Sequence, residues 1–130
     1  MLNSSTLAQF TGDMERYRHG LCRNLIYTPG VHYVLENGGE GDNSAHWLLD
    51  AIASYQYDKR INENEDAKYL QFWKIVVRKN KVAILTCDDG NGNILITQTI
   101  RYADFCLPEI QIWVGDNGDG TRTAYLPSEH

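Results

Sequence analysis

Two side chains that can move a proton, His46 and Asp50, stand four residues apart in the string His-Trp-Leu-Leu-Asp. On a helix, residues at positions i and i+4 lie next to each other on one face. A carboxylate in that position can orient an imidazole, or both groups can contact one ligand. The spacing therefore predicts an acid–base pair or a polar binding face, although such a pair on a solvated helix is also common without any function.

The element that must position this pair is a helix predicted over residues 45–56. Its apolar residues follow the i, i+3, i+4, i+7 spacing of a buried stripe. On the opposite side, His46, Asp50 and Ser54 recur every four residues. Trp47 flanks this polar side, where a large aromatic residue either anchors a partner or packs in the core. One face of the helix is thus expected to pack and the other to bind.

The thiols offer a second kind of chemistry. The chain has three cysteines and no Cys-x-x-Cys pair, which argues against a disulfide framework and against a zinc ribbon. Cys22 lies near Arg18, His19 and Arg23, so it is the one thiol with a sequence-based reason to be reactive. We predict no metal and no cofactor, because no second ligand pair at zinc spacing and no phosphate-binding glycine motif is present.

Two further helices are predicted before residue 45. A short one is expected between Ser4 and Gly12. A longer one is expected over residues 29–36, because Thr28 can cap the first turn and Pro29 suits the first helical position. The helix over 45–56 is expected to take its cap from the side chain at position 43 or 44.

From Tyr69 onward the hydrophobic period changes to two, which is typical of strands. Short polar or Asn-Gly turns join the first three of these segments, so neighbouring strands must be antiparallel. The expected strands cover residues 71–77, 82–87, 93–100 and 110–114. The sequence therefore predicts a two-layer α+β domain, in which a four-stranded antiparallel meander in the C-terminal half is covered on one face by two to three N-terminal helices. Residues 57–68 are read as a solvated connection.

Aromatic residues on the expected strands suggest a second binding surface. The neighbours of Trp73 and Trp113 alternate between polar and apolar, so one or both are expected on the open sheet face beside Tyr102. Such a face can stack bases or bind protein. The acidic balance of the chain favours protein.

The length, composition and net charge of the chain limit which of these hypotheses can hold. It has 130 residues, with 12 basic and 17 acidic side chains and a formal net charge of −5. We expect a single domain over residues 1–130. The acidic excess argues against direct nucleic-acid binding. The absence of a long apolar run or an export signal predicts a cytoplasmic protein with no membrane segment. A homo-oligomer is also consistent with the sequence.

Several strings of residues together look familiar. They are Gln9-Phe-Thr-Gly12, Tyr27-Thr-Pro-Gly-Val31, the helix string from Trp47 to Gln56, Cys87-x-Asp-Gly-Asn91, Thr97-Gln98, Tyr102-x-Asp-Phe105 and Leu126-Pro-Ser-Glu129. With these strings the chain resembles a family of small uncharacterised bacterial and phage-borne proteins that is described only as a domain of unknown function. The stretch from Glu40 to Ser44 looks like extra length relative to that family. The resemblance implies a setting of bacteria, phage or mobile elements and brings no catalytic residues with it.

These observations lead to three functional hypotheses. The first is a non-catalytic protein-binding module whose unidentified protein partner contacts the residues singled out above: His46, Trp47, Asp50, Ser54, Trp73 and Trp113. The first alternative is a small hydrolase or transferase that uses His46 and Asp50. The second alternative is an acidic inhibitor of a nucleic-acid-binding host-defence protein, which requires the acidic side chains to gather on one face.

Overall fold

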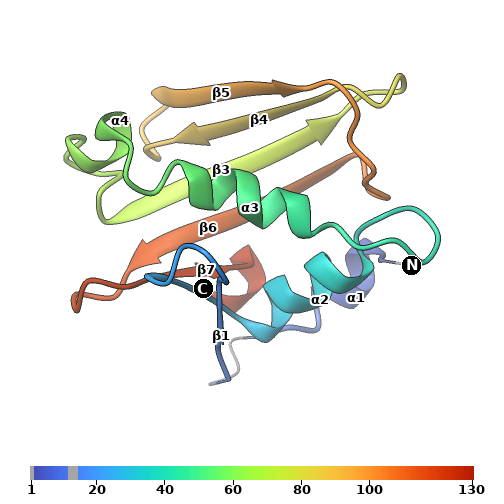
Figure 1. The fold of residues 1–130 in the computed structure, drawn as a ribbon, viewed down its shortest axis with the longest axis horizontal. Helices are drawn as coiled ribbons and strands as arrows, with labels where there is room; N and C mark the ends of the chain where they lie inside the picture. Colours follow the sequence, from blue (N-terminus) through green and yellow to red (C-terminus); the bar gives the residue numbers. More distant parts are fainter. Residues whose placement is uncertain (1, 12–14) are drawn as a thin grey trace.

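A seven-stranded sheet with helices packed on it forms the fold in the computed structural model, which describes residues 2–11 and 15–130 (Figure 1). The strand order is β1-β2-β7-β6-β3-β4-β5. The helices are α1 (Ser4–Leu7), α2 (Pro29–Asn37), α3 (His46–Ser54) and α4 (Lys59–Asn62), and a 3-10 turn, η1 (Pro127–Glu129), ends the chain. The strands are β1 (Tyr17–Arg18), β2 (Leu25–Tyr27), β3 (Leu70–Val77), β4 (Ala83–Asp88), β5 (Ile94–Ile100), β6 (Glu109–Asp116) and β7 (Arg122–Tyr125).

The α+β class is confirmed, but the four-stranded meander is wrong. Strands β3, β4 and β5 do form an antiparallel meander. β6 does not continue it, because the connection over residues 101–108 carries the chain back to the other side of β3. The resulting order β6-β3-β4-β5 is that of a Greek key, in which three hairpin-connected strands are followed by a fourth that returns beside the first.

Three short strands extend the sheet beyond the expected four. β7 pairs with β6 antiparallel, and β2 pairs with β7 in parallel, with Leu25 opposite Arg122 and Tyr27 opposite Ala124. β1 then pairs antiparallel with β2. Segments from the two ends of the chain therefore share one side of the sheet.

Helices α2 and α3 cover one face of the sheet. Thr28 caps α2, since its side chain accepts a hydrogen bond from the amide of Val31, and Pro29 takes the first helical position as predicted. α3 buries its expected stripe, which includes Leu48, Leu49 and Ile52. Its N-terminus carries no side-chain cap, so the prediction of a cap from position 43 or 44 is wrong.

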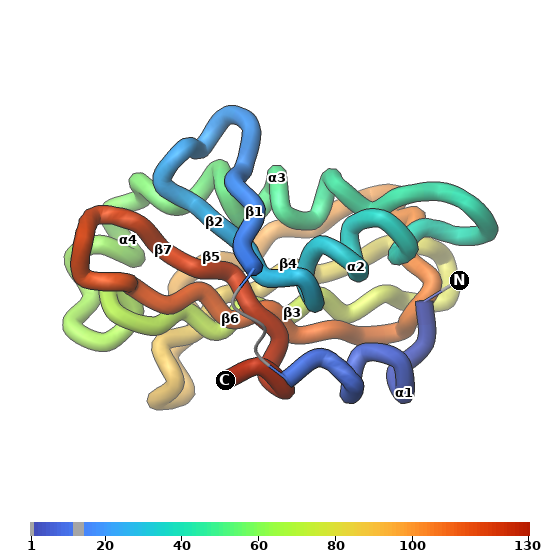
Figure 2. The backbone as a smooth tube through the Cα atoms, turned by 90° about the horizontal axis from the view of Figure 1, so that it is seen from below, coloured from blue at the N-terminus to red at the C-terminus, as the bar shows by residue number. Residues whose placement is uncertain are grey.

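The helices do not all lie on one face. Figure 2 shows α1 on the side of the sheet opposite to α2 and α3, close to the C-terminus. Within the predicted connection over residues 57–68, Asp58 accepts a hydrogen bond from the amide of Arg60 and so caps the short helix α4. Hydrogen bonds from Arg60 lower the pKa of Asp58 to about 2. Among the described residues the longest helices have nine residues, and none could cross a bilayer.

Candidate functional site

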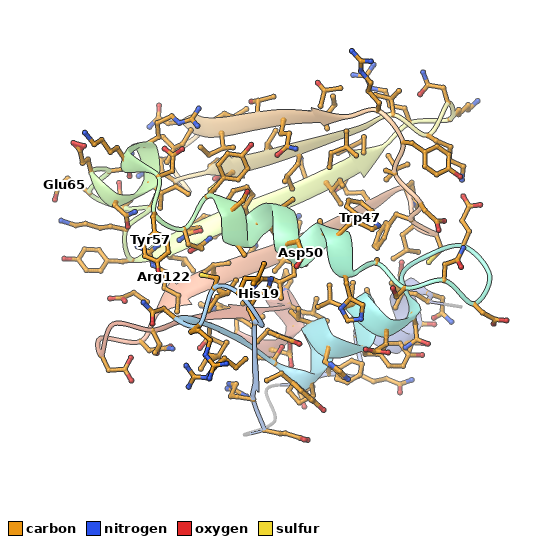
Figure 3. The ribbon with its side chains drawn as sticks, in the orientation of Figure 1. His19, Trp47, Asp50, Tyr57, Glu65 and Arg122 are labelled. Carbon is orange, nitrogen blue, oxygen red and sulfur yellow. The ribbon has the colours of Figure 1, made fainter. Side chains whose placement is uncertain are left out.

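The loop between β1 and β2, residues 19–24, lies against the outer side of α3. His19 Nε2 is 2.8 Å from Asp50 Oδ1 on that helix (Figure 3). At the other end of the loop, the side-chain Nδ2 of Asn24 donates to the hydroxyl of Tyr57, just after the helix, at 3.2 Å. Two side-chain contacts from different points of the loop therefore hold it in place over α3.

The ring of His19 also organises the loop internally. Its Nδ1 accepts hydrogen bonds from the backbone amides of Leu21, at 3.2 Å, and Cys22, at 2.9 Å. A ring nitrogen that accepts carries no hydrogen, so the hydrogen of the neutral imidazole is on Nε2, which donates to Asp50. Both ring nitrogens are thus occupied, and His19 has no free position from which to take a proton.

The loop presents a large apolar side chain to water. Leu21 is 93% exposed, and Tyr57 nearby is 72% exposed. Fixed loops in soluble proteins rarely offer a leucine so fully to solvent, and neighbouring exposed apolar residues typically mark an interaction site. The geometry therefore combines a rigid support with an unburied hydrophobic group.

The exposed pair borders a groove along α3. We use the name α3 groove for the hollow of about 400 Å³ lined by His19, Leu21, Cys22, Asp50, Ala53, Ser54 and Tyr57. A second hollow of about 270 Å³ shares Cys22 and Tyr57 and continues toward Arg122 (Figure 3). The surface thus has enough concavity to receive a side chain from a partner.

Arg122 forms part of the wall of the second hollow. One guanidinium nitrogen donates to the backbone and side-chain oxygens of Gln56, and the other donates to Asn62 at 2.6 Å. Gln56 in turn exchanges two hydrogen bonds with the buried Gln71. This network joins the segment just after α3 to α4, β3 and β7, and it fixes this wall of the second hollow.

Two positively charged side chains lie beside the groove, in the hairpin that β1, β2 and the loop between them form. Arg18 and Arg23 are both exposed there, and Arg18 donates to the backbone carbonyl of Arg23. Neither guanidinium forms an ion pair within the part of the chain that the structure describes. In a chain of net charge −5, this leaves a local basic surface next to Leu21.

The predicted acid–base pair does not form. His46 and Asp50 are both exposed on α3, but His46 Nε2 lies 3.1 Å from Glu36 Oε1 on α2, and Asp50 pairs with His19. A small hollow of about 160 Å³ is lined by His19, His46 and Asp50. Among the described residues, no serine, threonine or cysteine side chain hydrogen-bonds to a ring nitrogen of either histidine.

The other predicted residues of α3 divide between surface and core. Ser54 is exposed, and its hydroxyl donates to the carbonyl of Ala51. Trp47 is half-buried and packs edge-on against Phe105, with ring centroids 6.4 Å apart. Ser54 therefore lies on the expected binding face, whereas Trp47 mostly joins the core.

The two strand tryptophans lie on opposite faces of the sheet. Trp73 is 1% exposed, packs against Tyr55 just after α3 and donates to Gln71 Oε1 at 2.7 Å, so it lies in the core and is not the one on the open face. Trp113 does stand on the outer face, edge-on to Phe72 at 5.0 Å. The register explains the difference, because Trp73 pairs with the inward-facing Ile112. Tyr102 is exposed but lies outside any strand.

The three cysteines are free. Burial and the nearby Asp88 raise the pKa of the Cys87 thiol to about 12, so this thiol is protonated and unreactive near neutral pH. Cys22 is half-buried at the edge of the α3 groove. In the described ranges, no group of three histidine, cysteine or acidic side chains could hold a metal ion.

Three contributors to the site were not singled out as binding residues from the sequence: Leu21, Tyr57 and Arg122. The sequence could have indicated Leu21, since a lone leucine in the polar stretch Arg-His-Gly-Leu-Cys-Arg is hard to bury. It could not have indicated Arg122, because the hydrogen-bond partners of Arg122 are about 60 residues away in the chain.

Comparison with known proteins places the chain in a family. A family model described as a family of unknown function (DUF6876) matches residues 1–130. The chain belongs to this family. No curated protein matches the chain. A crystal structure of a protein of unknown function from Enterococcus faecalis is similar, with 18% identity, a TM-score of 0.50 and coverage of 91% of this chain and 93% of that one.

These comparisons establish the family and support the fold. At 18% identity, the solved structure shows a shared fold and nothing about activity. The predicted setting in bacteria, phage or mobile elements and the predicted cytoplasmic location stay predictions.

Proposed function

We propose that the chain is a non-catalytic protein-binding module whose binding surface is the α3 groove with the flanking hairpin. The observation that carries this proposal is Leu21, which is 93% exposed on a loop fixed by the three hydrogen bonds of the His19 ring. A loop already held in its bound shape loses little conformational entropy when a partner binds. An exposed leucine on such a support is a good binding anchor.

The surface favours a partner of a particular chemistry. Leu21 and Tyr57 offer apolar contact area, and the adjacent groove of about 400 Å³ can receive an apolar side chain. Arg18 and Arg23 add positive charge that has no ion-pair partner among the described residues. The best match is a protein segment with one apolar anchor residue and carboxylates close to it.

Two other functions have less support. An acidic inhibitor needs its carboxylates on one face, but the described ones are spread, with Glu36 and Asp50 in the helical layer and Glu109 on the outer side of the sheet. A hydrolase or transferase that uses His46 and Asp50 needs the two side chains to act together, but His46 lies beside Glu36 and Asp50 pairs with His19.

A random peptide library displayed on particles and selected against the immobilised chain tests this proposal. We expect the selected peptides to share an apolar residue with Asp or Glu nearby. Leu21→Ser and the double change Arg18→Glu, Arg23→Glu should each weaken binding of such a peptide by about tenfold or more, as loss of an anchor or a charge pair does.

Matched controls come from exposed residues far from the groove. Tyr102→Ser removes an exposed aromatic, and Lys74→Glu reverses an exposed charge on the outer face of the sheet. Both should leave peptide affinity unchanged. Failure to select any common peptide class, or equal binding by Leu21→Ser and the unaltered chain, would rule out this surface.

A further inference from the structure

The strand at one edge of the sheet, β5, lacks most of the usual protection against pairing, and its one irregularity is a register shift at its first residues. It bonds to β4 on one side only, and no described helix or strand lies beyond it (Figure 1). Its seven residues, Ile-Leu-Ile-Thr-Gln-Thr-Ile, contain no charge, proline or glycine. Native proteins normally block such an edge with a charged residue, a proline, a bulge or a covering segment.

The strand at the opposite edge of the sheet, β1, does have such protection. β1 has only two residues, and one of them is Arg18. In β5 the register shift falls at its first residues, beside Cys87 and Asp88, and the stretch from Ile96 to Ile100 pairs regularly with β4. Alternate residues of this stretch direct their backbone N–H and C=O groups away from the sheet. These groups can form a regular ladder with another strand.

The two ends of the β5 edge carry opposite charge. At the start of the strand lie Asp88 and the exposed Asp66, whose carboxylate accepts a hydrogen bond from Asn91 in the adjoining turn. At the end of the strand lie the exposed Arg101 and Lys79, because the turn between β3 and β4 is next to Ile100. Lys81 in that turn is already paired with Glu40.

From this arrangement we propose that two copies of the chain associate through antiparallel pairing of their β5 strands, so that the two sheets become one. Antiparallel pairing places the basic end of each copy beside the acidic end of the other, which makes the edge complementary to itself. A twofold axis through Thr97 sets Ile96 opposite Gln98 of the second copy, within the stretch that pairs regularly with β4. Such a contact is closed, since each copy uses the one long free edge found in the described part of its sheet, and it stops at the dimer.

The dimer does not depend on the α3 groove. Leu21, Tyr57 and the hairpin arginines belong to other elements of the fold, so loss of peptide binding and loss of the dimer are separate results. An interface built around one strand pair is small, and we expect it to be in equilibrium with the monomer.

Sedimentation equilibrium over a concentration range of about 5 to 500 μM measures the association directly, since contacts of small area dissociate in that range. The mass should rise from 14.8 kDa toward twice that value. Thr97→Lys places two like charges face to face on the axis and should weaken the dimer at least about tenfold. Gln111→Lys adds the same charge to the same face on the interior strand β6 and should leave the dimer intact.

Charge reversal supplies an independent test that does not disturb the strand. Arg101→Glu alone should weaken the dimer, and combining it with Asp66→Lys should restore association, because the reversed charges again meet their opposites. Amide hydrogen exchange at alternate residues of β5 should slow as concentration rises. A monomer throughout the range, a dimer unaffected by Thr97→Lys, or assembly beyond the dimer would each overturn the proposal.

Discussion

Two tryptophans show how differently one residue type can be held in this molecule. The indole nitrogen of Trp73 donates to Gln71 Oε1, and that oxygen also accepts from Gln56, so the buried polar atoms satisfy each other. The indole nitrogen of Trp47 is also buried, but no described group accepts its hydrogen. An unsatisfied buried donor costs about 1–3 kcal/mol of desolvation.

Replacement of each tryptophan by phenylalanine should therefore have unequal effects. Trp73→Phe removes a hydrogen bond and leaves a cavity in the core, so we expect a loss of about 2–4 kcal/mol. Trp47→Phe removes apolar contact but also the unsatisfied donor, so the net loss should stay near 1 kcal/mol or less. Urea unfolding of both variants checks this, and equal losses would contradict the account of Trp47.

At the scale of the element, the local patterns of the sequence were sufficient to predict the type and approximate bounds of the long helices and strands. The i, i+4 stripe of α3 and the alternation of β3, β4 and β5 each involve neighbours in the chain, so these elements could be predicted close to their observed bounds. β1, β2 and β7 have two to four residues each, too few to show a period. Their pairing depends on contacts between the two ends of the chain, which no local pattern reveals.

The turn between β4 and β5 gives a test of one predicted element. Gly90 and Gly92 both have positive φ, at 83° and 89°. A Cβ on Gly90 would lie 2.7 Å from the ring of Phe72, whereas a Cβ on Gly92 would meet nothing within 4 Å. A side chain at either position would therefore have the same cost in backbone strain. Only a side chain at Gly90 would also clash with a neighbouring residue.

Gly92→Ala should destabilise the fold by about 1–2 kcal/mol, which is the cost of a left-handed conformation for a residue with a Cβ. Gly90→Ala should lose more, because the Phe72 ring must also move away from its contact with Trp113. Tryptophan fluorescence during chemical unfolding measures both the stability and the environment of that contact. If both variants unfold at the same denaturant concentration, the steric contribution of Phe72 is absent.

At the scale of the whole molecule, the two ends of the chain meet at the start of α2. Glu129 accepts hydrogen bonds from the Thr28 hydroxyl, at 2.6 Å, and from the amide of Gly30, at 3.3 Å. Two of the strings that carry the family resemblance, Tyr27–Val31 and Leu126–Glu129, thus form one structural unit. Thr28 and Pro29 could be predicted as a helix start from local sequence, but Glu129 could not, since it is about 100 residues away.

The candidate site likewise has a part that could be predicted from local sequence and a part that could not. The exposed side of α3 with Asp50 and Ser54 was predictable, because helical period places these residues together. The loop that covers this side was not, because His19 reaches Asp50 across 31 residues of chain. The pairing of distant segments, which decides where Leu21 stands, depends on how β1, β2 and β7 complete the sheet.

Glu129→Ala should show how much the junction of the chain ends contributes to stability. Its carboxylate satisfies donors at a helix N-terminus, where a negative charge is also favourable, so we expect a loss of about 1–2 kcal/mol and a Tm lower by roughly 3–8 °C. Glu129→Gln keeps one oxygen acceptor but removes the charge, and it should lose less. Glu109→Ala, at an exposed position of β6, should leave the Tm nearly unchanged. If Glu129→Ala and Glu109→Ala have the same Tm, the hydrogen bonds of Glu129 do not contribute to stability. The β2–β7 pairing alone would then join the two ends of the chain.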